Sequence, residues 1–294
     1  MKALVIGASG QVGTELMRLL ARTNGADALG TYSKHPAAGL RQLDITSPSS
    51  VASLFKEYEP DTVFLCAAMA HVDLCQEQPE LARKVNAHGP ANVAAACACK
   101  GTRLVFVSTD YVFDGSKGMY AEGDTPAPLN EYGRSKLEAE NRIGGLCRNL
   151  VIARTAMVYS YNPSSSNFAM QLMNNSSKGT KMRVADDIYA SPTYAPDLAV
   201  MLLKLAESGK TGLYHAAGGA RVSRLEFAKT FCKTMGLDDN FIDPVPGAVF
   251  KPKAPRPPDS SLSVDKIKRD TGHFPLDYEK GLKLFKQSAL EAGI

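Results

Sequence analysis

Short apolar segments alternate with amphipathic stretches through the first half of the chain. Apolar runs predict buried strands at residues 3–6, 28–32, 62–66, 104–107 and 150–153. Helical spacing of apolar residues predicts helices at residues 11–22, 51–58, 80–100 and 132–143. Strands that alternate with helices indicate an α/β fold with a doubly wound parallel sheet covered on both faces. Ligands of such a sheet bind beyond the carboxyl ends of its strands.

The alternation weakens in the second half of the chain. Residues 162–167 are rich in Ser, Asn and Pro and predict a loop, and the proline-rich residues 244–258 are not expected to form a regular element. We therefore predict a larger domain at residues 1–155 and a smaller substrate-binding lobe at residues 156–294, partly interleaved with it.

Composition removes several classes of function. The chain has 294 residues, 44% of them hydrophobic, which is enough for a large core. Its net charge of +4 comes from scattered Lys and Arg, so we expect no nucleic-acid partner, while anionic nucleotides fit the mild positive bias. The sequence contains no apolar run of roughly 18 residues, so we expect no membrane span. Six cysteines without a C-x-x-C pair favour a reduced, cytoplasmic compartment and give no sign of a metal site.

A glycine-rich turn follows the first predicted strand. Residues 7–13 read Gly-Ala-Ser-Gly-Gln-Val-Gly and open the first predicted helix. Glycines permit a tight turn and let the backbone approach a pyrophosphate, which the free N–H groups of the helix end then bind. This context predicts that residues 1–155 form a Rossmann-type dinucleotide-binding domain.

The second strand bears on the choice of cofactor. An acidic residue that binds the ribose 2′-OH of NAD is expected about 20 residues after the glycines. Residues 30–35 contain no Asp or Glu, whereas Ser33 and Lys34 could meet a 2′-phosphate. We therefore favour NADP(H) over NAD(H), although Lys34 could instead be a solvated loop lysine.

Candidate catalytic residues follow the fourth strand. Tyr132 and Lys136 are spaced as Y-x-x-x-K, so on a helix they share one face. A neighbouring ammonium lowers the pKa of a phenol from about 10, and Tyr can then act as a general acid or base. Ser108 and Thr109 end the strand, where a hydroxyl could hold a substrate carbonyl.

Together these motifs resemble the extended short-chain dehydrogenase/reductase family. Residues 107–115 (Val-Ser-Thr-Asp-Tyr-Val-Phe-Asp-Gly) and 126–133 (Pro-Ala-Pro-Leu-Asn-Glu-Tyr-Gly) further resemble dTDP-4-dehydrorhamnose reductases. The resemblance spans nearly the whole chain. It implies NADP(H)-dependent reduction of a nucleotide-linked 4-keto-6-deoxy sugar, and family members are often homodimers.

The resemblance also implies roles for individual residues. The catalytic residues would be Thr109, Tyr132 and Lys136. The cofactor would contact Tyr132, Lys136 and the following residues: Gly7, Gly10, Gln11, Val12, Gly13, Ser33, Lys34, Asp44, Ile45, Ala67, Ala68 and Ala70. The sugar would lie beside Ser108, Asp110, Tyr111, Met157 and Asn167. Asp44 could equally be a turn residue that leads into a helix.

The chain departs from the family's pattern on the substrate side. Residues 154–159 read Arg-Thr-Ala-Met-Val-Tyr, where the family shows Arg-Thr-Ser-Trp-Val-Tyr. Ser261 stands at the arginine of the family's Asn-Ser-Arg-Leu, and residues 187–190 also differ. The cofactor motifs are intact.

Two alternatives therefore stay open. The regulatory beta subunit of methionine adenosyltransferase shares the run at residues 108–115, so the chain could bind NADP and a partner protein without turnover. A sugar-nucleotide epimerase or dehydratase is the other alternative, but Thr109 is followed by Asp110 and Tyr111 rather than by the Asp-Glu pair of the dehydratases.

Overall fold

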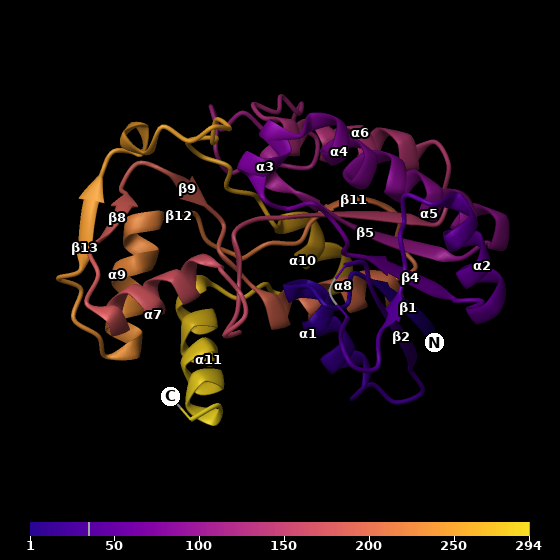
Figure 1. Ribbon diagram of the computed structural model, residues 1–294, viewed down its shortest axis with the longest axis horizontal. Coiled ribbons are helices and arrows are strands. Elements are labelled where there is room, and N and C mark those ends of the chain that lie inside the picture. Colours follow the sequence, from indigo (N-terminus) through magenta and orange to yellow (C-terminus); the bar gives the residue numbers. More distant parts are fainter. Residues whose placement is uncertain (35, 294) are drawn as a thin grey trace.

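The computed structural model describes residues 1–34 and 36–293. Within them, a seven-stranded sheet has the order β11-β6-β5-β4-β1-β2-β3, and all its strand pairs are parallel (Figure 1). The strands are β1 (Lys2–Ile6), β2 (Asp27–Tyr32), β3 (Arg41–Gln42), β4 (Thr62–Leu65), β5 (Arg103–Thr109), β6 (Leu150–Thr155) and β11 (Gly212–His215). The order reverses beside β1, which confirms the predicted doubly wound fold and puts the switch point between β1 and β4.

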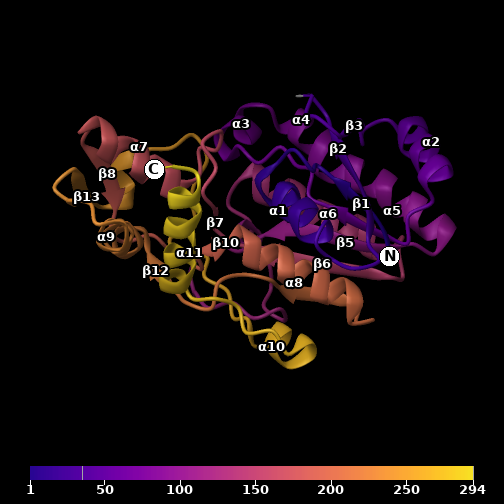
Figure 2. The ribbon, with the colours of Figure 1, turned by 90° about the horizontal axis from the view of Figure 1, so that it is seen from below.

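Each face of the sheet carries its own apolar core. Along β1, Ala3 and Val5 face one core while Leu4 and Ile6 face the other, as the alternation of a strand requires. The first core is covered by α1 (Gln11–Leu20), α8 (Ala195–Glu207) and α10 (Asp265–Thr271). The second is covered by α2 (Pro48–Tyr58), α5 (Gly89–Lys100) and α6 (Glu131–Gly144). Figure 2 shows α1 and α8 packed side by side below the sheet.

The helix predicted at residues 80–100 is interrupted. The chain forms α3 (Val72–Glu77), which the sequence did not predict, then α4 (Pro79–Arg83), a π-helical turn (Lys84–His88) and α5. A π turn inserts an extra residue into the helical repeat, so no apolar periodicity announces it. It turns Asn86 into the interior, where 1% of its surface is exposed.

The second lobe is a separate packing unit beside the sheet. Its elements are β7 (Val158–Tyr159), α7 (Phe168–Lys178), β8 (Met182–Ala185), β9 (Tyr189–Ala190), β10 (Thr193–Tyr194), β12 (Val222–Ser223), α9 (Arg224–Met235), β13 (Ile242–Val245) and α11 (Tyr278–Glu291). The pairs β7–β10, β9–β12 and β8–β13 surround a core rich in aromatic rings, including Phe227, Phe231 and Phe285. Because α8 and β11 return to the main sheet, the two parts are interleaved along the chain.

The proline-rich stretch is more regular than its composition suggested. Pro244 lies in β13, opposite Val184 of β8, and a 3₁₀ turn follows at Gly247–Phe250. A two-stranded pair consists of edge strands, so a proline can be accommodated where its missing N–H faces away from the partner. The expectation of no regular element at residues 244–258 was therefore wrong for this part.

Three features of the described residues bear on the sequence predictions. The six cysteines are all free thiols. None of the described helices has the length and apolar character needed to cross a membrane. In the same residues, no group of three or more His, Cys, Asp or Glu side chains could hold a metal ion.

Candidate active site

The glycine turn fits a dinucleotide phosphate because side chains are excluded from it. Gly7 has φ of +88°, and a Cβ there would lie 2.7 Å from the Ala67 nitrogen. A Cβ at Gly13 would lie 2.3 Å from the Gly7 carbonyl oxygen. Gly10 is the N-cap of α1 and has no side chain to occupy the first free amides of the helix. The amides of Gly7, Ala8 and Gly10 are bonded within the protein, whereas the first N–H groups of α1 are left to an anion, which fits the pyrophosphate of a dinucleotide.

The neighbouring residues of the turn have different environments. The Gln11 side chain donates a hydrogen bond of 3.1 Å from Nε2 to the Ser160 hydroxyl, so it links α1 to the second lobe. Val12 is half-buried and packs against the core on the α1 face of the sheet. The Ala8 amide is bonded to the Thr31 carbonyl at 2.7 Å, which fixes the turn against β2.

The predicted adenosine-side residues lie at the carboxyl ends of β2 and β3. Ser33 and Lys34 follow β2 and are exposed. Asp44 is exposed too, and its Oδ1 accepts hydrogen bonds of 2.8 Å from both the amide and the hydroxyl of Thr46, which is the turn role that the sequence left open. The Ile45 side chain is buried against Gly89, so only its backbone faces the edge of the sheet.

The three predicted alanines follow β4 on the opposite side of the switch point. Ala67 packs against Gly7, whereas Ala68 and Ala70 are exposed. The loop that carries them is held by Asn86, whose Oδ1 accepts from the Met69 amide at 2.8 Å and whose Nδ2 donates to the Met69 carbonyl at 3.1 Å. Asn86 was not predicted, because only the π turn brings it to this loop.

The structure brings together the three predicted catalytic side chains. Thr109 ends β5, and Tyr132 and Lys136 lie one turn apart on α6. The Thr109 hydroxyl lies close enough to the Tyr132 phenol to lower its pKa. The Lys136 ammonium, 2% exposed, donates a hydrogen bond of 2.7 Å from Nζ to the Val107 carbonyl and lies 3.9 Å from the centre of the Phe106 ring. Asn130 caps α6 by accepting a bond from the Gly133 amide at 2.9 Å.

The electrostatics of this group differ from the sequence-based expectation. Burial raises the pKa of Tyr132, and the Thr109 hydroxyl opposes that shift only in part. Burial lowers the pKa of Lys136 to about 7, against the opposing effect of Glu140. The expected lowering of the Tyr132 pKa by Lys136 is therefore absent, because in this protein desolvation outweighs the cation. At neutral pH the phenol keeps its proton.

Three residues around Thr109 have distinct surroundings. Neighbours on a strand face opposite sides, so Ser108 and Thr109 have different partners, and Ser108 donates a hydrogen bond of 2.5 Å to Glu140, two turns along α6 from Tyr132. Asp110 is 4% exposed and accepts from the hydroxyls of Thr109 and Ser260, and burial raises its pKa to about 6. Tyr111 lies on the active-site side, with its ring centre 6.1 Å from that of Tyr132.

The other two predicted substrate residues lie where the second lobe begins. Met157, at the position of the family's Trp, is half-buried and has a left-handed backbone with φ of +40°. Asn167 is the N-cap of α7, and its Nδ2 donates a hydrogen bond of 2.9 Å to the Ser160 carbonyl. Its side chain thus braces the lobe.

Sequence reasoning missed two arginines near Tyr111. The Arg224 guanidinium, at the start of α9, lies close to Tyr111 and Asp110, and its charge opposes the rise that burial causes in the pKa of both groups. The charge of Arg256 also opposes the rise of the Tyr111 pKa, and Arg256 donates a hydrogen bond of 2.9 Å to Asp73. Both come from segments far from Tyr111 along the chain, so residue spacing could not place them beside it.

The segment at residues 253–260, which we call the strap, joins the two parts beside α6. The side-chain Nδ2 of Asn130 donates a hydrogen bond of 2.8 Å to the Pro255 carbonyl, so the N-cap of α6 is also an anchor of the strap. Asp73 of α3 accepts from the Ala254 amide at 3.0 Å. The strap therefore positions Ser260 on Asp110, next to Thr109.

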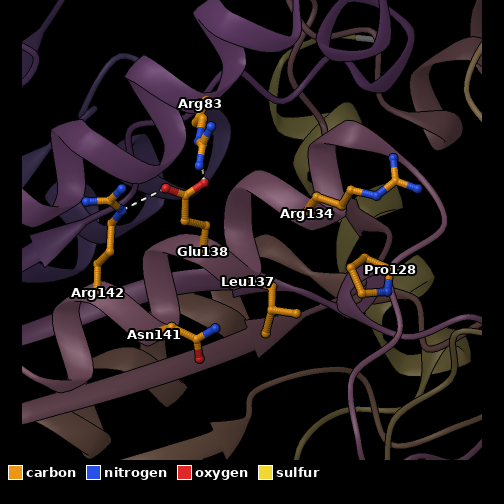
Figure 3. A pocket seen from close by; sticks show the side chains of 7 residues that line it. All are labelled: Arg83, Pro128, Arg134, Leu137, Glu138, Asn141 and Arg142. Carbon is orange, nitrogen blue, oxygen red and sulfur yellow. Dashed lines mark hydrogen bonds and ion pairs between the residues drawn. The ribbon is translucent and has the colours of Figure 1, made fainter.

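A shallow pocket on the outer side of α6 is distinct from this site. It is lined by Arg83, Pro128, Arg134, Leu137, Glu138, Asn141 and Arg142 (Figure 3). Glu138 accepts hydrogen bonds of 2.7 Å from both Arg83 and Arg142, so the pocket is a solvated ion-pair network and contains none of the predicted site residues.

Comparison with known proteins agrees with this geometry. The RmlD substrate binding domain family matches residues 1–290. A probable low-salt glycan biosynthesis reductase, Agl14, of Haloferax volcanii is 34% identical over 92% of this chain and 93% of its own length. A dTDP-4-dehydrorhamnose reductase of Mycobacterium tuberculosis is 37% identical over 89% of this chain and 84% of its own length.

Solved structures give the same result. The dTDP-4-dehydrorhamnose reductase of Bacillus anthracis, solved in complex with NADP, has a TM-score of 0.89 and 32% identity over 98% of this chain and 99% of its own. That of Clostridium acetobutylicum has a TM-score of 0.90 and 32% identity over 99% of this chain and 100% of its own. The chain therefore belongs to the RmlD substrate binding domain family, within the extended short-chain dehydrogenases/reductases, whose members include dTDP-4-dehydrorhamnose reductases and related sugar reductases.

Proposed function

We propose that this chain uses NADPH to reduce the 4-keto group of a nucleotide-linked 6-deoxy sugar. The observation that carries the proposal is the grouping of Thr109, Tyr132 and Lys136 beside the glycine cradle at the carboxyl edge of the sheet. The six free cysteines support a cytoplasmic location.

Each of the three side chains has a role that its surroundings support. Bound NADPH would supply the hydride. Tyr132 would donate its phenolic proton to the keto oxygen, and its raised pKa keeps it in the protonated form that reduction needs. The Thr109 hydroxyl would hold the same oxygen in place. The Lys136 ammonium would bind the ribose next to the nicotinamide and contribute positive charge near the developing oxyanion.

The cofactor preference depends on the end of β2. Ser33 and Lys34 are exposed there, and a phosphate on the adenosine ribose could accept hydrogen bonds from both. An acid that would repel that phosphate does not occur at residues 30–35. We therefore propose NADPH rather than NADH, and the comparison to make is the Kd of each reduced cofactor with the same preparation.

The substrate diphosphate is proposed to bind near Arg224. This guanidinium lies close enough to Tyr111 to oppose the rise of its pKa, and the Tyr111 ring packs edge-on against Tyr132. A diphosphate placed here would meet a planar cation, which suits bidentate phosphate binding. The attached sugar would then extend past Tyr111 towards Thr109.

The direct test is NADPH oxidation, followed at 340 nm, with dTDP-4-dehydro-6-deoxy-L-mannose as substrate. We expect turnover by the wild-type chain and a loss of roughly 100-fold or more in Tyr132→Phe, with NADPH binding retained. Full activity in Tyr132→Phe would refute the assignment of the proton donor. NADPH binding without turnover would direct the search to other keto sugars or to a partner-binding role.

A further inference from the structure

Three ionisable or hydroxyl side chains recur along one face of α6. Tyr132, Lys136 and Glu140 follow one another at intervals of four residues, so they lie one above the other on the side that faces the sheet. Lys136 is 2% exposed and Glu140 is 6% exposed. The face that carries the proposed chemistry thus continues one turn further into the core and ends at a carboxylate.

Buried hydrogen bonds hold the Glu140 carboxylate in place. Its Oε1 accepts from the Ser108 hydroxyl at 2.5 Å and from Arg154 Nε at 3.0 Å, and its Oε2 accepts from Arg154 Nη2 at 2.6 Å. Hydrogen bonds from three donor atoms restrict the carboxylate to one orientation. Glu140 is therefore held in a fixed position one turn beyond Lys136.

The same contacts fasten α6 to the end of β5. Lys136 donates to the Val107 carbonyl, and the next residue of the strand, Ser108, donates to Glu140. Thr109, which follows, reaches Tyr132. Two consecutive residues of β5 are thus hydrogen-bonded to two successive turns of α6, and the third, Thr109, lies near the turn that carries Tyr132.

Few other groups set the charge of Lys136. On β5, its ammonium meets the Val107 carbonyl and the Phe106 ring. The thiol of Cys66, after β4, has its pKa raised to about 12 by burial, so it is uncharged at neutral pH. On the neighbouring strand β6, Arg154 forms an ion pair with Glu140. Glu140 opposes the lowering of the Lys136 pKa by burial, and its effect is larger than that of Cys66.

We propose that Glu140 is a positioning residue for the reaction, whose buried carboxylate keeps the Lys136 amine charged and aligned against β5. The proposal extends the proposed function, because it assigns a purpose to the protonated state of Lys136. It concerns residues that do not touch the substrate and acts only through Lys136.

The sign of the effect follows from charge. Burial disfavours the ammonium, and a carboxylate nearby favours it. Without that carboxylate, the proton leaves Lys136 at a lower pH. A reaction that needs the charged amine would then lose activity at a lower pH on its alkaline side.

The experiment compares Glu140→Gln with Glu140→Asp. Gln keeps the shape and an acceptor oxygen but removes the charge, whereas Asp keeps the charge and shortens the side chain. We expect the alkaline half-point of kcat/KM to fall by about one pH unit or more in Glu140→Gln and to stay near the wild-type value in Glu140→Asp. Glu138→Gln is the matched control, two positions away on the exposed side of α6, and should not move the profile.

A second measurement needs no turnover. The ¹³Cε shift of Lys136, assigned by its loss in Lys136→Met, is followed against pH in protein grown on labelled lysine. A titration midpoint that falls in Glu140→Gln supports the proposal even if the substrate tested is not turned over. An unchanged titration midpoint of Lys136 in Glu140→Gln overturns the proposal. It does so even if both Glu140 variants are less stable and less active, provided that the loss of activity is equal at every pH.

Discussion

Replacing Gly13 by alanine should damage the cofactor site through backbone displacement alone. The added Cβ would lie 2.3 Å from the Gly7 carbonyl oxygen and 2.7 Å from the Ala8 Cα. Both atoms belong to the turn, so relief requires the turn to move by about 1 Å away from α1. Overpacking of this kind costs about 1–3 kcal/mol of folding free energy.

The cost in cofactor affinity follows from the same movement. A hydrogen bond to a charged group contributes about 1.5–3 kcal/mol, and the displaced turn should lose one such bond to the pyrophosphate. A loss of that size weakens binding by about 10-fold to 100-fold. We therefore expect the Kd for NADPH, measured by isothermal titration calorimetry, to rise by that factor.

Two further glycines provide the graded controls. A Cβ at Gly10 would lie 3.3 Å from the Gly7 oxygen, so Gly10→Ala should raise the Kd only a few-fold. Gly144, at the far end of α6, has open space around its added Cβ, and Gly144→Ala should bind NADPH normally with equal or greater stability. Normal NADPH affinity in Gly13→Ala would refute the reasoning that this turn cradles the pyrophosphate.

Three other predictions follow from charge and capping. Burial lowers the pKa of Lys136 to about 7, so above that pH the folded state binds fewer protons than the unfolded state. This residue should therefore make the free energy of unfolding rise by up to about 1.4 kcal/mol per pH unit between pH 7 and 10. Lys136→Met should abolish that rise in urea unfolding curves, and an unchanged dependence on pH would contradict the lowered pKa of Lys136. Asn130→Ala removes a helix cap and an anchor of the strap, so we expect a loss of about 1–2 kcal/mol together with lower turnover, while Ser47→Ala, a cap of the remote α2, should lose stability without losing turnover. Arg224→Gln should raise the KM for the nucleotide sugar about tenfold with little change in the Kd of NADPH, and an unchanged KM would place the diphosphate elsewhere.

Local periodicity was sufficient to predict five of the seven strands of the main sheet. The five strands read from apolar runs correspond to β1, β2, β4, β5 and β6, because a buried parallel strand is apolar on both faces. The two-residue β3 was missed because Arg41 and Gln42 are polar and exposed, and the late strand β11 was missed because its partner β6 lies far earlier in the sequence. The π turn at residues 84–88 was missed because helical periodicity is the signal it disrupts.

The candidate site divides in the same way. Tyr132 and Lys136 are four residues apart, so their shared face could be read from the sequence. The contact of Arg224 with Tyr111 joins residues 113 positions apart (224 − 111) and depends on how the second lobe packs. The state of ionisation was also beyond the sequence, because it depends on burial: spacing predicted a lowered Tyr132 pKa, and the structure raises it.

The strap has a consequence for how the substrate range of this protein can change. The main-chain carbonyl of Pro255 accepts the hydrogen bond that joins the strap to α6, and the main-chain amide of Ala254 donates the hydrogen bond that joins it to Asp73. Main-chain atoms persist when a side chain is replaced, so many substitutions along the strap leave these ties intact. Residues of the second lobe can therefore diversify around a new sugar while Asn130 continues to hold the first turn of α6, and with it Tyr132, in register.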